Sequence, residues 1–260
     1  MEAGQLGNYT YFFLLVMIRY TGIFLITPVL GSRVIPGRVK IAVSFFMALV
    51  TVPILNRMEM VLFPARNVEI LLTVMRELAV GLTIGLLTYL VFAAFQLAGQ
   101  FIDLRMGFRM ANIVDPMRGT SSPLVGQLKN VLATLVFLSL NGHHILIEGL
   151  HRSFAIIPPG GMSVSSGFWE LLFRRSADVF IIAFKVALPI MGTIFIADII
   201  FAFLARSIPQ MNIFIVGFPV KIFVGILFLV LSIHIIINFY DSRFQQLFRD
   251  IINLIRLLGP

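Results

Sequence analysis

The chain has 260 residues, of which 59% are hydrophobic and 12% are charged. Soluble globular domains contain about 45–50% apolar and about 25% charged residues, so this composition excludes an ordinary water-soluble enzyme. The net charge of +8 comes from single basic residues between apolar blocks, a pattern that favours helix-end anchoring and lipid headgroups over nucleic acid. The sequence contains no cysteine, which excludes disulfides and thiolate metal sites.

Six apolar blocks follow one another along the chain and predict the helices of a membrane protein. About 20 residues cross a hydrocarbon core of about 30 Å, so every block except the short second one is long enough to span it. The blocks lack the alternation of barrel strands, and we therefore expect an all-α fold. The first block follows residues without a basic group, so we expect a retained membrane helix there and not a cleaved signal peptide. The blocks cover residues 9–30, 39–55, 68–97, 124–147, 177–204 and 213–240.

Proline and glycine predict breaks inside the last two blocks. Pro189 and Gly192 lie within the fifth block, and Gly217-Phe218-Pro219 lies within the sixth, so we expect discontinuous helices or bent hairpins there. Unwound backbone at membrane depth is tolerated only when it is buried in protein or lines a cavity. The two predicted breaks therefore indicate a cavity, a pore or a large interface.

A long loop, residues 103–123, separates the third and fourth blocks. It mixes arginine, aspartate, glycine and proline with apolar residues. Loops of this length inside compact helical proteins are usually functional or disordered, and the apolar side chains favour an ordered element packed in a cavity. The connection at residues 157–166 has a plainer composition of proline, glycine and serine, and we expect it to face solvent.

The C-terminal residues 241–260 predict an amphipathic helix. Apolar residues recur at helical spacing from Phe244 to Leu258, and arginines occupy the other face. Such a helix lies on a membrane surface or docks on a partner. The sequence leaves both alternatives open.

Charged residues inside the apolar blocks indicate helices that contact protein more than lipid. A charge at the centre of a span costs about 2.5–3.5 kcal/mol on insertion scales, so such groups usually face protein, water or each other. Arg76 and Glu77 are neighbours whose side chains point apart on a helix, so we expect each to pair with another helix. The candidate inter-subunit or buried polar contacts are Arg19, Arg76, Glu77, Lys185, Asp198, Arg206, Gln210, Asn212 and Lys221.

Two constellations resemble small functional sites. Lys185 and Asp198 flank the predicted break at Pro189, as the coupling pair of a secondary transporter would; pairing with another chain is the alternative. His144, Glu148 and His151 fall on one helical face, which is compatible with a metal, but no fourth ligand is apparent and polar packing at a helix end is favoured. No phosphate-binding loop or metalloprotease motif occurs. We expect no enzyme activity, no cofactor and no metal.

Several short motifs follow one another in a particular order along the chain. They are Arg19, Gly22, Phe24, Pro28, Gly31, Pro36, Val39 and Lys40, then Arg76-Glu77-Leu78 with Gly81 and Gly85, Val114-Asp115-Pro116, and Asn141-Gly142-His143. The longest motif covers residues 206–221, which begin Arg206-Ser207-Ile208-Pro209. In their order and spacing these motifs resemble the FliR family of flagellar type III export-gate membrane proteins and its virulence counterparts, and the similarity extends over nearly the whole chain.

The resemblance implies a subunit of the gate through which unfolded flagellar proteins leave the cytoplasm. FliP-like and FliQ-like subunits, a FlhB-like protein and the rest of the export apparatus and basal body would be its partners. The exported proteins would be its cargo. The expected location is the bacterial inner membrane at the flagellar basal body, with much of the chain raised above the bilayer plane. The implied parts are a FliP-like part at 1–175, a FliQ-like hairpin at 176–240 and the C-terminal helix at 241–260.

The resemblance also implies a plug loop, residues 106–122, that closes the channel until substrate passes. Flexible thioethers and apolar groups close around an empty pore and yield to varied polypeptides. The rival interpretations are an autonomous proton-coupled secondary transporter that uses Lys185 and Asp198, and a membrane scaffold without a pore. The candidate plug residues are Met106, Phe108, Met110, Ile113, Asp115, Pro116 and Met117.

Overall fold

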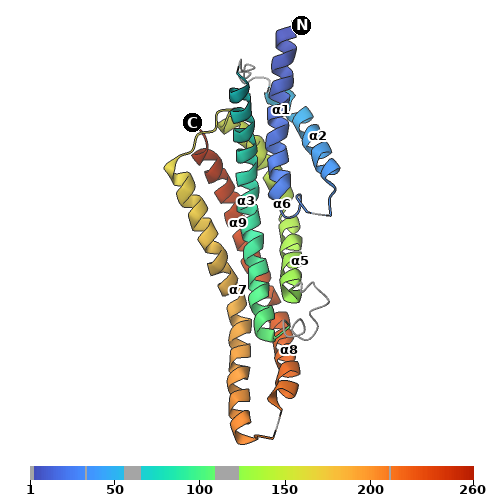
Figure 1. The fold of residues 1–260 in the computed structure, drawn as a ribbon, viewed down its shortest axis with the longest axis vertical. Helices are drawn as coiled ribbons and strands as arrows, with labels where there is room; N and C mark the ends of the chain where they lie inside the picture. Colours follow the sequence, from blue (N-terminus) through green and yellow to red (C-terminus); the bar gives the residue numbers. More distant parts are fainter. Residues whose placement is uncertain (1–2, 33, 56–65, 109–122, 211) are drawn as a thin grey trace. The chain divides into compact units, whose positions relative to one another are not determined.

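The computed structural model describes residues 3–32, 34–55, 66–108, 123–210 and 212–260. These residues form eight α-helices and no strand (Figure 1). The expected all-α fold is therefore confirmed. The helices are α1 (Ala3–Ile26), α2 (Gly37–Leu55), α3 (Asn67–Met106), α5 (Leu124–Ser139), α6 (Gly142–Ile156), α7 (Ser166–Ser207), α8 (Ile213–Leu231) and α9 (Ile233–Leu257).

Four of these helices, α1, α2, α3 and α7, are long and apolar enough to cross a membrane. The pairs α5 with α6 and α8 with α9 are each interrupted by a short break, and they bring the number of possible spans in the described residues to six if each pair counts as one. The chain is thus an all-α membrane protein with four to six apolar segments of spanning length.

The chain divides into two compact units. Unit 1 comprises residues 1–90, 141–175 and 244–260, and unit 2 comprises residues 91–140 and 176–243. Helices α1, α2 and α6 belong to unit 1, and α5 and α8 belong to unit 2, whereas α3, α7 and α9 each contribute one part to either unit. The FliP-like and FliQ-like parts expected from the sequence remain predictions.

In unit 1, α1 carries several fully buried side chains. Leu15, Val16 and Tyr20 on α1 are at most 1% exposed. Helix α2 packs on α1 through an edge-to-face contact of Phe13 with Phe45, whose ring centroids are 5.2 Å apart. The Tyr20 hydroxyl also forms a buried 2.8 Å hydrogen bond with the Thr51 hydroxyl.

The helices are broken, but not at the predicted positions. Helix α7 runs without interruption through Pro189, and α8 runs through Pro219. A proline removes one backbone hydrogen bond, and burial of Val186, Ala187 and Ile190 beside it keeps α7 together. The breaks instead fall at Leu140–Asn141, where Asn141 has a left-handed φ of 54°, and at Ser232 between α8 and α9.

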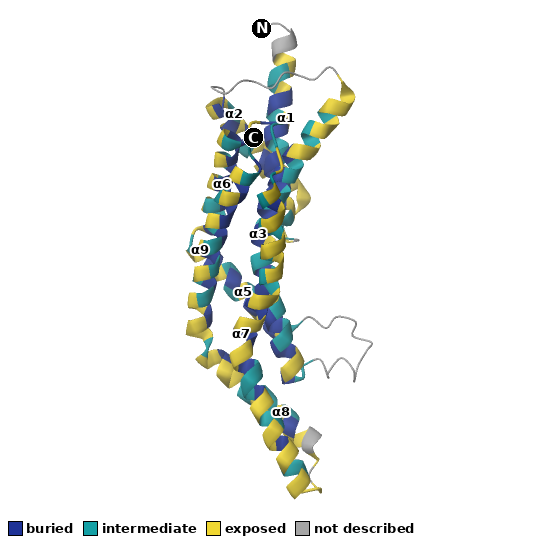
Figure 2. Cartoon of the chain, turned by 90° about the vertical axis from the view of Figure 1, so that its left-hand side faces the viewer, coloured by how far each residue is buried: buried dark blue, intermediate teal, exposed yellow. Residues whose placement is uncertain are grey.

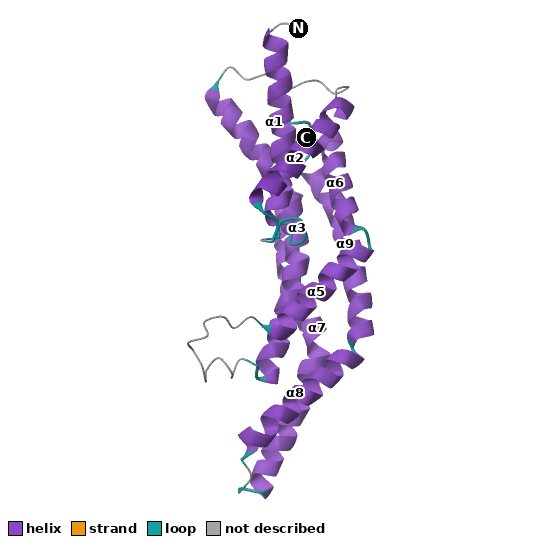
Figure 3. Ribbon diagram, turned by 90° about the vertical axis from the view of Figure 1, so that its right-hand side faces the viewer, coloured by secondary structure: helices purple, strands orange, loops and turns teal. Residues whose placement is uncertain are grey.

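Helix α8 forms a hairpin with the last part of α7 in unit 2 (Figure 1 and Figure 3). Most of α8 is exposed in the isolated chain, as Figure 2 shows in yellow. Its exposed apolar side chains include Ile215, Phe223 and Leu231, each at least 65% exposed. This hairpin therefore offers a large apolar surface that its own chain leaves uncovered.

The C-terminal amphipathic sequence does form a helix, but it is the second part of α9 and it docks on its own chain. Ile251 packs so closely on α6 that a Cβ at Gly149 would lie 3.2 Å from it. The backbone amide of Ser163 donates a 3.0 Å hydrogen bond to the Leu258 carbonyl. Both predicted locations, a membrane surface or another chain, are therefore wrong for its apolar face. Six residues of that helix, Phe244, Leu247, Ile251, Leu254, Ile255 and Leu258, are at most 2% exposed, while Phe248 and Ile252 are half-buried.

Candidate functional site

A fully buried ion pair joins α1 to α3 in unit 1. Nε of Arg19 donates to Oε2 of Glu77 at 2.6 Å, and Nη2 donates to Oε1 at 3.0 Å; both side chains are 0% exposed. The guanidinium also donates to the Ser153 hydroxyl and to the Ile157 carbonyl, each at 3.0 Å, and lies 4.2 Å from the centroid of the Phe154 ring. A buried pair is tolerated when its remaining donors and acceptors are also satisfied, and this pair meets that condition.

The same carboxylate fixes the connection after α6. The Gly160 amide donates to Oε1 of Glu77 at 2.7 Å, and Arg76 donates to the Gly160 carbonyl at 3.2 Å. Gly160 has a φ of +81°, a conformation that favours glycine, and Pro159 beside it is buried. The expectation that the connector at residues 157–166 faces solvent is wrong for Ile157 and Pro159, which are buried, and the backbone of this connector supplies polar partners to the core.

A second polar contact lies in unit 2, where α3 meets the start of α5. Helix α3 ends at Met106 and not at Leu97, so Asp103 lies on a helix. Its carboxylate accepts the Val125 amide at 3.0 Å and the Gly126 amide at 3.1 Å, and Asp103 is 1% exposed. The first amides of a helix have no partner within it. Asp103 therefore caps α5 from a neighbouring helix.

Next to this cap, the backbone of α3 lies directly against the backbone of α5. A Cβ at Gly99 of α3 would lie 2.3 Å from the Cα of Gly126 on α5. The Pro123 side chain also packs on Gly126, 3.1 Å from where a Cβ would stand. Only glycines allow α3 and α5 to approach this closely.

The end of α3 is anchored on α8 in the same unit. Met106 is fully buried, and its side chain fills the space next to Gly225, where a Cβ would lie 2.6 Å from the Met106 methyl carbon. The next residue, Gly107, has a φ of +82°, and the Phe218 ring lies 2.8 Å from where its Cβ would be. The chain therefore leaves α3 at a packed and sterically defined position.

These contacts lie directly before and directly after the predicted plug loop in the sequence. Of the candidate plug residues, Met106 is a buried helix residue and Phe108 lies half-buried in the turn after α3. Pro123 then begins the described chain again, directly before α5. The remaining candidates lie outside the described residues: Met110, Ile113, Asp115, Pro116 and Met117.

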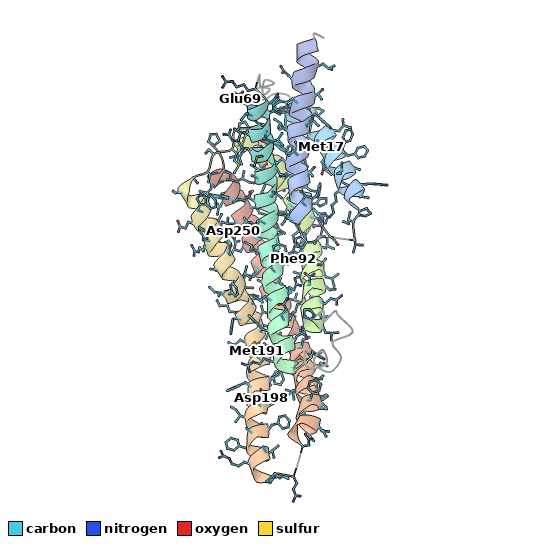
Figure 4. All side chains as sticks on the ribbon, in the orientation of Figure 1. Met17, Glu69, Phe92, Met191, Asp198 and Asp250 are labelled. Atoms are coloured by element: carbon cyan, nitrogen blue, oxygen red, sulfur yellow. The ribbon has the colours of Figure 1, made fainter. Side chains whose placement is uncertain are left out.

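The transporter interpretation requires Lys185 and Asp198 to act as a pair, and the charged residues of the α7–α8 hairpin pair differently. Asp198 on α7, labelled in Figure 4, forms an ion pair with Lys221 on α8, and both side chains are about one-third exposed. Lys185 is exposed on α7. The structure thus pairs Asp198 with Lys221 and does not bring it together with Lys185. Three further candidate polar contacts, Arg206, Gln210 and Asn212, are exposed near the turn between α7 and α8.

Two of the three candidate metal-binding residues, Glu148 and His144, make other contacts. Glu148 pairs with Arg152 one turn along α6, at 2.6 Å, and the rings of His143 and His144 stack with centroids 4.6 Å apart. Within the described ranges, no group of three or more such side chains could hold a metal ion.

Two charges in the described part of unit 2 are buried, and sequence reasoning misplaced one of them, Asp103. Asp103 was assigned to a loop, although Gly99 lies one helical turn before it and marks the same close helix contact. Lys129 on α5 is 0% exposed, and its Nζ has no hydrogen-bond partner among the residues that the structure describes.

Comparison with known proteins decides the family. The model of the family described as bacterial export proteins, family 1, matches residues 10–247. The chain belongs to this family. The matched region contains the Arg19–Glu77 pair, the Asp103 cap and the Asp198–Lys221 pair. The resemblance inferred from the sequence motifs is thereby confirmed.

Curated relatives that the chain matches include flagellar proteins. It is 34% identical over 252 residues to the flagellar biosynthetic protein FliR of Bacillus subtilis (strain 168), covering 95% of each chain. The protein of the same name from Aquifex aeolicus (strain VF5) is 30% identical, with 87% of each chain covered. That of Escherichia coli (strain K12) is 28% identical, covering 92% of this chain and 90% of the relative.

Proposed function

We propose that this chain is a subunit of the flagellar protein export gate and that residues 106–122 contribute the plug that closes its channel. The observation that supports the proposal is that the residues on either side of this segment are packed in unit 2. One end follows Met106, which is buried on α8, and the other precedes α5, which Asp103 holds to α3. A segment whose two ends are fixed in a packed unit is suited to blocking a passage without loosening the surrounding helices.

The length of α7 supports assembly with other chains. Exposed phenylalanines occur from Phe173 to Phe203 along this helix, a stretch of about 45 Å at about 1.5 Å per residue. A hydrocarbon core of about 30 Å would cover that stretch only at a tilt of about 48°, beyond the usual range of about 0–40°. Part of the apolar face of α7 therefore contacts other protein chains instead of lipid.

The proposed contacts of this apolar face are with the rest of the export apparatus. FliP-like and FliQ-like subunits and a FlhB-like protein would pack on the exposed faces of α7 and α8 and lift part of the chain above the bilayer plane of the inner membrane. The exposed residues Lys185, Arg206 and Gln210 would then face these subunits. Co-purification of this chain with its FliP-like and FliQ-like neighbours tests the assignment, and a stable, monodisperse chain without them would contradict it.

The proposed mechanism is passive gating. Apolar and thioether side chains close the empty channel against ions and small solutes, since flexible methionines adapt to surfaces of different shape. Exported polypeptides displace the plug when they engage, and other components of the apparatus supply the energy. No catalytic step is assigned to this chain.

Deletion of residues Met110–Gly119 tests the plug directly. We expect the deleted chain to assemble with its partners, because the contacts of Met106 and Asp103 lie outside the deletion. We also expect cells with this assembly to become permeable to small solutes, measured as influx of an otherwise excluded ion.

The control for this deletion replaces the same residues with a glycine and serine segment of equal length. This variant keeps the spacing of the loop ends and removes the apolar side chains, so it should leak as the deletion does. Unchanged permeability in an assembled deletion variant would overturn the plug assignment.

A further inference from the structure

The part of α7 that belongs to unit 2 carries a regular row of residues that its own chain leaves uncovered. Ile181, Lys185, Leu188, Phe195 and Ile199 follow one another at intervals of four, three, seven and four residues, which is the spacing of the core positions of a coiled coil. Lys185 is exposed, and the four apolar side chains are between 41% and 60% exposed. We call these five residues the α7 seam.

The opposite face of α7 packs on unit 2. Val186, Ile190 and Ile194 are at most 4% exposed, and at the edge of this face the Phe184 ring contacts Phe101 of α3, with the ring centroids 5.2 Å apart. The α7 seam therefore points away from the core of its own unit and is placed to contact another molecule.

Lys185 gives this surface a specific chemical requirement. Among the residues that the structure describes, none forms an ion pair with the Lys185 ammonium group. It is the sole charged residue between Asp178, about 10 Å away along the helix, and Asp198, which pairs with Lys221. A lone charge within an apolar surface is costly in lipid and in a dry protein interface unless a counter-charge meets it. The missing group is therefore a carboxylate.

We propose that the α7 seam receives one helix of a neighbouring gate subunit and that this helix carries an aspartate or glutamate opposite Lys185. The apolar residues of the seam supply the contact area. The pair of Lys185 with the carboxylate fixes the register of the two helices, as a single polar residue at a core position does in a coiled coil. This inference rests on the proposed function, because the neighbour is a subunit of the export gate.

Crosslinking in the purified gate tests the pair. A lipid-soluble carbodiimide joins an amine to a carboxylate in direct contact with it, with loss of water, and mass spectrometry identifies the linked peptides. We expect Lys185 to be linked to an aspartate or glutamate in a helix of a neighbouring subunit. Lys185→Arg should assemble as the wild type does and lose the link, because it keeps the charge and has no primary amine.

Charge reversal tests the same pair without a reagent. Lys185→Glu should lower the recovery of the crosslinked subunit per chain by about tenfold or more, because like charges across an interface repel. Lys185→Gln should lower it less. Replacing the crosslinked acid with lysine should restore recovery in Lys185→Glu. Arg249→Glu is the matched control, since Arg249 is an exposed basic residue on α9, outside the seam.

Two phenylalanines of α7 distinguish the seam from the rest of the apolar surface. Phe195 lies in the seam and Phe180 lies outside it, and their side chains are 54% and 63% exposed. Phe195→Ala should lower the recovery of the same subunit by about tenfold. Phe180→Ala should leave it unchanged, because this side chain projects from a different face of the helix.

The outcomes separate this inference from the gate assignment. If neighbouring subunits co-purify but Lys185 forms no crosslink, or if Lys185→Glu assembles as the wild type does, no carboxylate meets Lys185 and the inference is wrong, while the gate assignment stands. Equal recovery in Phe195→Ala and Phe180→Ala would contradict the seam and indicate lipid on this face. A wild-type chain that co-purifies with no neighbour would remove the gate assignment itself.

Discussion

Glu77 is the residue on which three parts of unit 1 converge. Its carboxylate accepts hydrogen bonds from Arg19 on α1 and from the Gly160 amide after α6, while Glu77 itself lies on α3. The exposed pair of Glu148 and Arg152 has a similar distance of 2.6 Å, but its side chains are 57% and 61% exposed. The two pairs share the same chemistry and differ in burial, so they form a natural comparison.

Glu77→Ala should strongly destabilise the protein, because it leaves the buried Arg19 guanidinium without its counter-charge. Removing one partner of a buried pair typically costs about 3–5 kcal/mol, whereas an exposed pair is worth about 1 kcal/mol or less. We expect a clear drop in the thermal midpoint of the purified complex for Glu77→Ala and little change for Glu148→Ala. Equal losses in the two variants would show that burial of the pair does not determine its contribution.

At the scale of helices, glycine determines where α1 approaches α3. A Cβ at Gly81 on α3 would lie 2.2 Å from the Arg19 carbonyl oxygen, and one at Gly22 on α1 would lie 2.9 Å from the Leu78 carbonyl oxygen. The Arg19–Glu77 pair lies one turn from these glycines. Close backbone contact therefore brings the two charged side chains within hydrogen-bonding distance.

Gly81→Ala should separate α1 from α3, since the added methyl group meets backbone and not a flexible side chain. Overpacking of this kind typically costs about 1–3 kcal/mol, and here it should also weaken the Arg19–Glu77 pair. Gly192→Ala on α7 is the control, because no described atom apart from its chain neighbours and its own helix backbone lies within 4 Å of the added Cβ. Alanine has the higher helix propensity, by about 0.8–1.0 kcal/mol, so this variant should raise the thermal midpoint. A Gly81→Ala protein as stable as the wild type would contradict the close contact.

The two longest described helices, α7 and α3, are longer than a hydrocarbon core is thick. Helix α7 has 42 residues and α3 has 40, so each is about 60 Å long at about 1.5 Å per residue. Only 33% of the most apolar window of α7 is buried in the isolated chain. An exposed apolar surface of this size is typical of proteins that contact lipid or other proteins.

Single cysteines introduced along α7 distinguish helix surface that contacts lipid from helix surface that contacts other protein chains. The natural chain has no cysteine, so Phe173→Cys, Leu188→Cys and Phe203→Cys each create one thiol. In the assembled gate, we expect a lipid-soluble thiol reagent to label no more than two of these sites. In the isolated chain in detergent, all three should react, because all are at least 60% exposed there. Labelling of all three sites in the assembled gate would show that α7 contacts lipid from Phe173 to Phe203.

The class of the protein follows from sequence alone. Membrane insertion depends on summed hydropathy over about 20 residues, and helix formation in lipid depends on backbone groups that must bond within the segment. Both are local properties, so the all-α membrane fold and the apolar segments were predictable. The family followed from the order of short motifs such as Arg76-Glu77-Leu78 and the match at residues 206–221.

The tertiary structure alone decided which charged groups pair and where helices end. Asp103 lies on α3 and caps α5, Asp198 pairs with Lys221 and not with Lys185, and α7 continues through Pro189. Each of these outcomes depends on which helices approach one another and on the burial around each residue. Sequence spacing carries no such information, because the approach of two helices is determined by the joint shape of both surfaces, as at Gly81 and at Gly126.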